Sequence, residues 1–140
     1  MKIFGQLFKK HFSAIIVLSL LVFIALACDT KSDSEWESEL GGKKLTTAKT
    51  SGSISDKIEI WFCPSGEYAK RTEFVGVSGD FTMADADVEQ GRWTIDSGVL
   101  TLTSGDGKTS QYDLSPGTDS DVIRLNGTGY LVERHNRCGR

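Results

Sequence analysis

The chain contains little histidine and proline, with two of each among its 140 residues. One histidine, His11, lies in the N-terminal segment, and the other, His135, lies in a polar C-terminal tail. Catalysis by a nucleophile needs a base within reach and a third group that orients the base. The chain also has no Gly-x-Ser-x-Gly turn to present a serine. We therefore predict no catalytic residues and no enzymatic activity, with His135 on the surface.

The chain also lacks a hydrophobic run of membrane-spanning length and a cluster of basic residues. Its longest apolar stretch, residues 13–27, is shorter than a spanning helix needs, which is roughly 20 residues. Three lysines and no acidic residue lie upstream of this stretch, which is typical of an export signal over residues 1–27. Removing that segment changes the formal net charge from −3 to −6, because three lysines and no acid are lost. We therefore expect no binding of nucleic acid.

Cysteine is also scarce, with three in the chain, and Cys28 follows the apolar stretch directly. The segment Ile24-Ala25-Leu26-Ala27-Cys28 resembles the lipobox of bacterial lipoproteins. That resemblance implies a signal peptide over residues 1–27 and a diacylglycerol on Cys28, which becomes the new N-terminus. The partner implied is a membrane, contacted through lipid (palmitate or similar chains), and the domain would face the periplasm or the cell surface.

Two alternatives to this interpretation remain. An ordinary secretory signal cut near Ala27 would use the same small residue, and an uncleaved helical anchor would use the same apolar run. The lipid anchor is the leading interpretation, and it predicts a location in a bacterial cell envelope, at the inner or the outer membrane.

The other two cysteines, Cys63 and Cys138, form an even pair once Cys28 carries lipid. In an exported protein such a pair predicts a disulfide. A bridge over a loop of this length stabilises a fold by about 4 kcal/mol in the chain-entropy model. Two free thiols are the alternative. A metal site is not expected, because two distant thiols and His135 offer no ligand spacing.

Residues 28–39 are polar and acidic, which predicts a flexible tether between the lipidated cysteine and a domain over residues 40–140. From residue 40 onward apolar residues recur with a period of two. Short strands joined by turn residues predict an all-β domain, a small antiparallel meander barrel of about seven or eight strands. The turns expected are Cys63-Pro64-Ser65-Gly66, Asp96-Ser97-Gly98, Ser104-Gly105-Asp106-Gly107 and Asn126-Gly127.

One stretch, residues 76–91, is too long for a hairpin turn, and we predict an open loop or a single helical turn there. Long loops in compact domains are often functional, so we take it as the candidate binding region. Its acidic residues would share one face if the segment were extended, and they would then offer oxygen ligands to calcium. A solvated acidic loop is the simpler alternative. The candidate residues are Asp80, Asp85, Asp87 and Glu89.

The segments Ile60–Tyr68 and Gly91-Arg92-Trp93, followed by alternating strands and Asn126-Gly127, resemble small lipocalin-like domains of bacterial lipoproteins. The resemblance implies a calycin-type β-barrel, and most members of this group have no assigned function. Trp93 is interpreted either as the tryptophan that plugs one end of such a barrel or as an ordinary core residue.

A second resemblance is to the periplasmic lipoprotein inhibitors of C-type lysozyme. It is carried by the spacing of Cys63 and Cys138 and by Gly127-Thr128-Gly129-Tyr130. Two functions are therefore expected. The first is a lipid-anchored, non-enzymatic envelope protein that binds a small ligand or a protein partner and needs no cofactor. The second is inhibition of lysozyme or another hydrolase.

Overall fold

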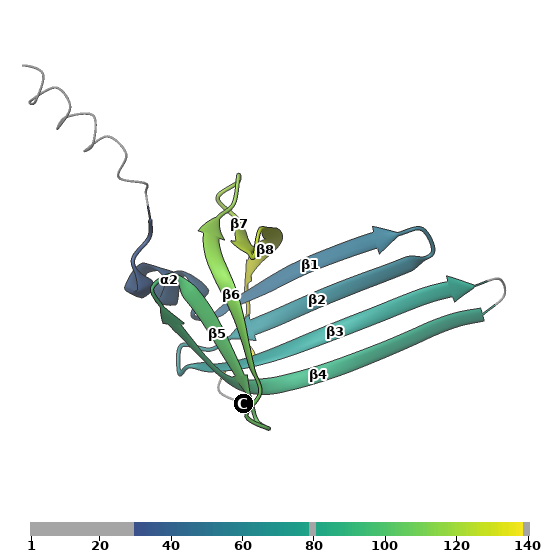
Figure 1. Ribbon diagram of the computed structural model, residues 1–140, viewed down its shortest axis with the longest axis horizontal. Coiled ribbons are helices and arrows are strands. Elements are labelled where there is room, and N and C mark those ends of the chain that lie inside the picture. The colour runs from purple at the N-terminus through teal and green to yellow at the C-terminus, as the bar shows by residue number, and fades with distance from the viewer. Residues whose placement is uncertain (1–29, 79–80, 139–140) are drawn as a thin grey trace, which may run out of the picture. The chain divides into compact units, whose positions relative to one another are not determined.

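The computed structural model describes residues 30–78 and 81–138, which form a closed β-barrel with one short helix (Figure 1). Each strand pairs antiparallel with the next in sequence, and β8 closes the barrel against β1. The predicted all-β meander barrel is therefore confirmed, with eight strands. The elements are α2 (Asp33–Leu40), β1 (Lys43–Ser51), β2 (Ile54–Phe62), β3 (Glu67–Ser78), β4 (Phe81–Asp96), β5 (Val99–Ser104), β6 (Thr109–Pro116), β7 (Val122–Leu125) and β8 (Thr128–Arg134).

The strands follow the period-two pattern, because alternate side chains point into the barrel and out to solvent. Burial removes each inward apolar side chain from water and is the main force that closes the barrel. Apolar side chains from the strands and from α2 fill the interior. The core consists of Trp36, Leu40, Leu45, Ile60, Phe62, Tyr68, Trp93, Ile95, Leu100, Leu102, Ile123, Leu125 and Tyr130.

The helix α2 corrects the predicted tether. We expected residues 28–39 to be flexible, but residues 33–39 belong to α2, and the compact unit begins at Lys31. Trp36 is 2% exposed and Leu40 is fully buried, because their spacing of four places both side chains on the helix face that covers the core. In the sequence, the spacing of Trp36 and Leu40 was the signal for this helix, but the polar and acidic residues around them obscured it.

Polar contacts hold α2 in place. The Glu35 carboxylate accepts hydrogen bonds from the Ser32 backbone N–H at 2.7 Å and from the Ser32 hydroxyl at 2.8 Å, which caps the helix start. The Asp33 carboxylate accepts from the backbone N–H groups of Ser97 and Gly98, both at 2.8 Å. These last two bonds tie the helix to the turn between β4 and β5.

All four predicted turns have the expected geometry. At Ser104-Gly105-Asp106-Gly107 the Gly107 N–H donates to the Ser104 carbonyl at 2.9 Å. The Gly66 N–H donates to the Cys63 carbonyl at 2.9 Å, as a four-residue turn requires. Asn126 and Gly127 both have positive φ, and so do Ser97 and Gly98. Two successive positive φ values are typical of the tight hairpin turn that asparagine and glycine favour.

Cys63 and Cys138 form a disulfide with a Cα–Cα distance of 5.4 Å. This separation is within the usual range for a disulfide, and the structure joins the pair that the cysteine count predicted. The bridge fastens the C-terminal tail to the end of β2. Cys28 lies outside the described residues.

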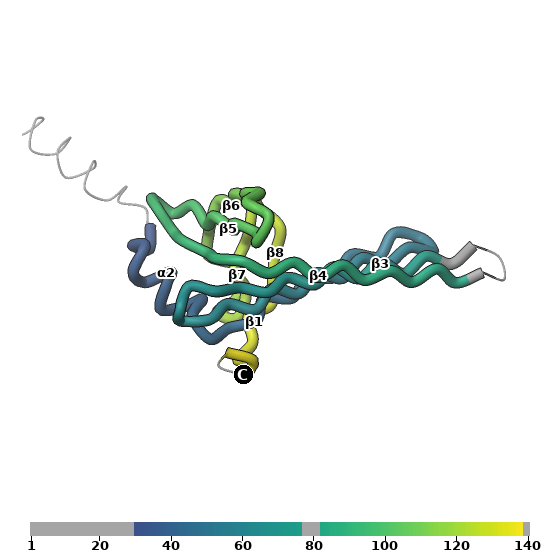
Figure 2. Tube along the Cα trace, turned by 90° about the horizontal axis from the view of Figure 1, so that it is seen from below, coloured from purple at the N-terminus to yellow at the C-terminus, as the bar shows by residue number. Residues whose placement is uncertain are grey.

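The strands differ strongly in length, and the longer ones extend beyond the barrel as a projecting sheet. β3 has 12 residues and β4 has 16, whereas β5 has six and β7 has four. The long strands run past the barrel together as a four-stranded projection (Figures 1 and 2). We call this projection the arm and define it as residues 47–58 and 72–87, apart from 79–80.

The arm corrects the prediction of a loop at residues 76–91. Apart from residues 79–80, which are not described, this stretch belongs to β3 and β4, and β4 pairs with β3 from Phe81 to Arg92. β4 passes from the arm into the barrel at Gly91. A Cβ atom there would lie 1.9 Å from the Thr103 carbonyl oxygen. Only glycine therefore allows β5 to approach this closely.

Candidate functional site

The barrel interior is filled by its own side chains. Phe62 and Trp93 pack edge to face with ring centroids 5.4 Å apart, an arrangement that aromatic pairs prefer. The Trp93 indole N–H donates to the Cys63 carbonyl at 3.0 Å. Trp93 is thus a core residue with a satisfied polar group. Small barrels are commonly filled in this way, and candidate sites are therefore sought on the surface.

The arm has two faces that both meet solvent. One face continues the barrel interior, and we call it the inner face; the other is the outer face. Strand pairing sets out cross-strand rows, since directly paired residues lie side by side. On the inner face the rows are Ser51–Ile54–Gly76–Met83, Lys49–Asp56–Phe74–Asp85, Thr47–Ile58–Thr72–Asp87 and Leu45–Ile60–Lys70–Glu89.

The predicted acidic residues of residues 76–91 lie along β4 in three successive rows. Asp85, Asp87 and Glu89 share the inner face, as expected for an extended segment. Asp80 lies outside the described residues. Among residues 30–78 and 81–138, no group of three or more His, Cys, Asp or Glu side chains could hold a metal ion, so the calcium interpretation gains no support.

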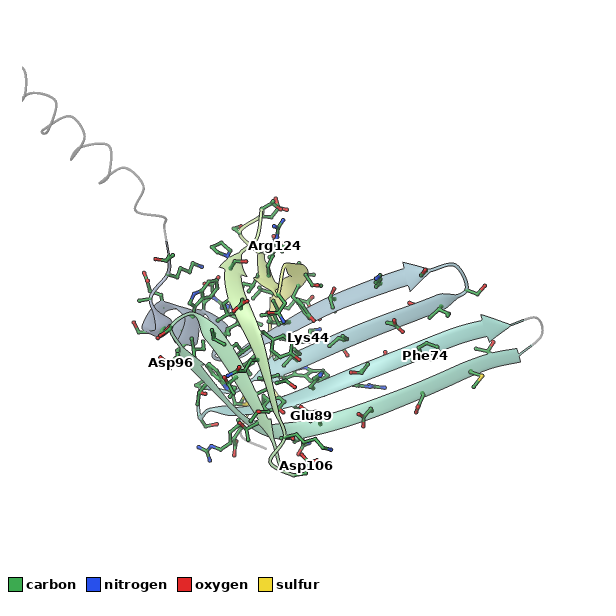
Figure 3. The ribbon with its side chains drawn as sticks, viewed as in Figure 1. Lys44, Phe74, Glu89, Asp96, Asp106 and Arg124 are labelled. Carbon is green, nitrogen blue, oxygen red and sulfur yellow. A yellow bond between two sulfur atoms is a disulfide. The ribbon has the colours of Figure 1, made fainter. Side chains whose placement is uncertain are left out.

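Glu89 stands apart from the other two acids because its carboxylate accepts a hydrogen bond from the Tyr68 hydroxyl. Burial, together with this carboxylate, raises the pKa of Tyr68 well above its ordinary value. Tyr68 therefore stays a neutral donor at physiological pH. This contact holds the Glu89 side chain, and Figure 3 shows Glu89 at the base of the arm. Asp85 and Asp87 are exposed.

The outer face carries ion pairs near the barrel. The Lys57 ammonium lies 3.2 Å from the Glu59 carboxylate, and the Lys44 ammonium lies 3.6 Å from Glu59 and 2.7 Å from Glu133. Burial alone would raise the pKa of Glu59, but the two ammonium groups outweigh it and hold that pKa below its ordinary value. Arg71 and Glu73 pair at 2.6 Å further along β3. The charges of the outer face are therefore largely matched.

The edge of β4 is the least protected element of the arm. β5 pairs with β4 only from Gly91 onward, and no strand among the described residues pairs with the other side of residues 81–90. The Gln90 carbonyl points to this side, since it accepts from the Gly105 N–H at 2.9 Å. Backbone groups alternate in direction along a strand, so those of four residues point to the open side: Thr82, Ala84, Ala86 and Val88.

An open hollow of about 310 Å³ lies where this edge meets the barrel. Its walls are residues 87–90 of β4 and the turn between β5 and β6, at Ser104, Gly105, Asp106 and Lys108. Lys108 pairs with Asp106 at 2.7 Å, and its hydrogen bond holds the pKa of Asp106 well below its ordinary value. Of the acidic residues that line the hollow, Asp106 is paired with Lys108, whereas Asp87 and Glu89 form no ion pair there with any described residue.

A second hollow, of about 450 Å³, lies beside the disulfide on the outer surface. The Arg137 guanidinium covers the Trp61 ring at 4.4 Å, a cation–π contact that fills part of the hollow with the chain's own cation. The nearby His135 is half-buried, and its Nε2 lies 3.1 Å from the Phe62 carbonyl oxygen. The predicted surface position of His135 is thus only partly correct.

Sequence reasoning missed that residues 81–90 form part of a strand, although a signal was present. Ala84, Ala86 and Val88 alternate with the three acids, which is the period of a strand.

No protein-family model matches the chain, and no curated protein matches it with significant sequence similarity. No helix within the described part of the chain is long and apolar enough to span a membrane.

Proposed function

We propose that this chain is a non-enzymatic lipoprotein of the bacterial cell envelope whose barrel domain binds a protein partner through the arm. The observation that carries the proposal is the division of the domain into a filled barrel and a projecting sheet. Because its interior is filled by core side chains, the barrel acts as a support. The arm offers two faces and an edge. A protein partner suits this shape better than a small ligand, because small ligands favour concave, mostly apolar pockets.

The arm supports a binding role because it exposes apolar side chains that folding alone would not require. Met83 is 70% exposed and Val88, at its base, is 59% exposed, and Ile54, Phe74 and Val75 also reach solvent. Scattered exposed apolar residues are ordinary, but Ile54, Phe74 and Met83 lie together on the inner face of the arm, while Val75 and Val88 lie on the opposite face. A partner that covers the inner-face side chains would remove apolar surface from water.

The membrane anchor rests on the lipobox-like sequence at Cys28. With α2 beginning at Asp33, only residues 29–32 would separate the lipid from the helix. Four extended residues span at most about 14 Å. The α2 end of the barrel would therefore be held near the bilayer surface, a closer attachment than a tether reaching to residue 39 would give.

Site-specific photo-crosslinking in the source organism tests the binding role. A photoreactive amino acid replaces Ala84 on the arm or, as the control, the exposed Thr118 between β6 and β7. We expect a discrete protein adduct from position 84 and none from position 118. Adducts at neither position would overturn the proposal.

The lipid anchor is tested separately. Mass spectrometry of the purified chain checks for lipid on Cys28, with Cys28→Ala as the control.

Inhibition of lysozyme is the second candidate, favoured by the Cys63–Cys138 bridge. The segment Gly127-Thr128-Gly129-Tyr130 carried the rest of the resemblance to these inhibitors. Its Tyr130 side chain is buried in the core and is therefore not available to contact lysozyme. Purified protein mixed with C-type lysozyme gives the test. We expect an unchanged lytic rate, and a loss of lysis that depends on the protein would replace the arm proposal.

A further inference from the structure

The open edge of β4 can accept one more strand. The backbone N–H and C=O groups of Thr82, Ala84, Ala86 and Val88 point away from β3 and meet no strand among the described residues. The Ala86 N–H donates to the Asp85 carboxylate at 2.9 Å, so an incoming strand has to displace that one bond. Such an edge is a template for an incoming chain, and natural sheets protect their edges with proline, lysine, bulges or covering elements. Residues 81–90 contain no proline and no lysine. The charged residues of this edge are the three acids Asp85, Asp87 and Glu89, and charged side chains at an edge oppose an incoming strand that carries like charges.

The charge beside this edge selects the incoming strand. Asp85, Asp87 and Glu89 follow one another at every second position on the inner face. An added strand places its own alternate side chains directly opposite them, where opposite charges stabilise and like charges destabilise the pair. A strand with lysine or arginine at every second position therefore fits.

A second copy of the chain fits this edge poorly. Two β4 edges paired antiparallel about Ala86 would place Asp85 of each copy opposite Asp87 of the other. Like charges at that distance oppose pairing. Among the described residues, β8 pairs with β1 from Lys43 to Thr46, which leaves only Thr47 to Ser51 of that edge without a partner strand and therefore a shorter ladder.

We infer that the edge of β4 over residues 82–88 binds an extended, basic segment of the partner protein as a fifth strand of the arm. Backbone hydrogen bonds supply the pairing, and the carboxylates of Asp85 and Asp87 select basic side chains. The hollow between β4 and the β5–β6 turn receives the end of the segment nearest the barrel. This inference rests on the proposed protein-binding function and names its site and the chemistry of the partner.

Two synthetic nine-residue peptides test the inference against the full chain purified in detergent. One alternates lysine with valine, and the other has glutamate in place of each lysine. We expect the lysine peptide to bind by fluorescence anisotropy and the glutamate peptide to bind at least about tenfold more weakly. Equal binding of the two peptides would overturn the charge assignment.

The backbone contribution is tested by Ala86→Pro, which removes the N–H group that donates to the Asp85 carboxylate and that an incoming strand would take over. Proline is tolerated on edge strands, so the fold should persist. We expect about a tenfold loss of affinity for the lysine peptide. As a check that needs no variant, bound peptide should slow hydrogen exchange at Ala84, Ala86 and Val88, and unchanged exchange there would overturn the inference.

The charge contribution is tested by the pair Asp85→Asn and Asp87→Asn, which keeps the shape of both side chains. The matched control, Asp119→Asn with Asp121→Asn, removes the same charge from the exposed β6–β7 connection. We expect about a three- to tenfold loss for the first pair and less than about a twofold change for the control. Equal losses would show a general charge effect and overturn edge recognition.

The outcomes separate this inference from the proposed function. Photo-crosslinking at position 84 combined with no binding of the lysine peptide would overturn the basic fifth strand and leave the binding role in place. Dimers in sedimentation equilibrium that disappear with Ala86→Pro would show that a second copy occupies the edge, which also overturns the basic segment.

Discussion

The barrel and the arm are built from the same long strands but meet different surroundings. Within the barrel, every second side chain of β4 enters the core, as Trp93 and Ile95 do. In the arm, the corresponding positions hold Asp85 and Asp87, which face solvent. The same backbone pairing therefore supports a hydrophobic core at one end and an accessible surface at the other. The difference shows that stability and recognition occupy separate lengths of the same strands.

Four predictions test this division, beginning with the end of the barrel that α2 closes. Trp36→Ala should lower the free energy of unfolding by about 4 kcal/mol, because a large buried aromatic side chain leaves a cavity. Urea denaturation measures the effect. The neighbouring Glu37→Ala, at an exposed position, is the control and should change stability by less than about 0.5 kcal/mol. A small effect of Trp36→Ala would mean that α2 does not contribute to the packed core and belongs instead to the predicted flexible tether.

Leucine and methionine truncations compare the two regions directly. The Leu102 side chain in the barrel core is 1% exposed, so Leu102→Ala should cost about 3 kcal/mol. Met83→Ala on the arm should cost less than about 0.5 kcal/mol, because water already surrounds that side chain. Thermal unfolding of both variants checks the difference. Similar losses would mean that the arm is part of the cooperative core.

Two glycines of the long strands, Gly91 and Gly76, should respond unequally to alanine. Gly91→Ala forces a Cβ atom against the Thr103 carbonyl and should cost about 2 kcal/mol or more through strain. At Gly76 the Cβ atom would meet the Phe74 ring at 3.2 Å. This ring is partly exposed and can turn aside, so we expect a loss below about 1 kcal/mol. Denaturation midpoints of the two variants give the comparison, and equal losses would contradict a tight corner at Gly91.

The smallest expected effect concerns the ion pairs where the arm joins the barrel. Because the folded-state pKa of Glu59 is lowered, its contribution is present above the unfolded pKa near 4.5 and is lost as pH falls through the folded value. Glu59→Gln should therefore destabilise by about 0.5 to 1 kcal/mol at about pH 7. The difference between wild type and variant should vanish in acid. A difference independent of pH would exclude the ion pairs as its cause.

The fold was largely predictable from local patterns. Alternation at Ile58, Ile60 and Phe62 and the Asn126-Gly127 pair predicted strands and a hairpin, and both rest on backbone geometry that neighbouring residues set. The arm was harder to predict. Residues 82–88 alternate correctly, but neither face is buried, so the usual apolar signal of a strand is weak. The stretch resembles a loop for that reason.

The candidate site was predicted in composition but not in form. Asp85, Asp87 and Glu89 were named as a set, and their common face follows from a strand's period of two. Their placement beside an unpaired edge depends on where β5 begins to pair with β4, which is decided by Gly91 and the close approach of Thr103. No local pattern in residues 76–91 contains that information.

The sequence by itself determined the alternating strands, the tight turns, the even pair of cysteines and the acidic period of β4, because each depends on residues close together in the chain or on simple counting. Only the tertiary structure decided that α2 covers the core through Trp36, that β1 to β4 outrun β5 to β8, and that the β4 edge stays open. These features depend on the relative lengths and packing of distant segments. Their free energy comes from burial and pairing that no single segment contains.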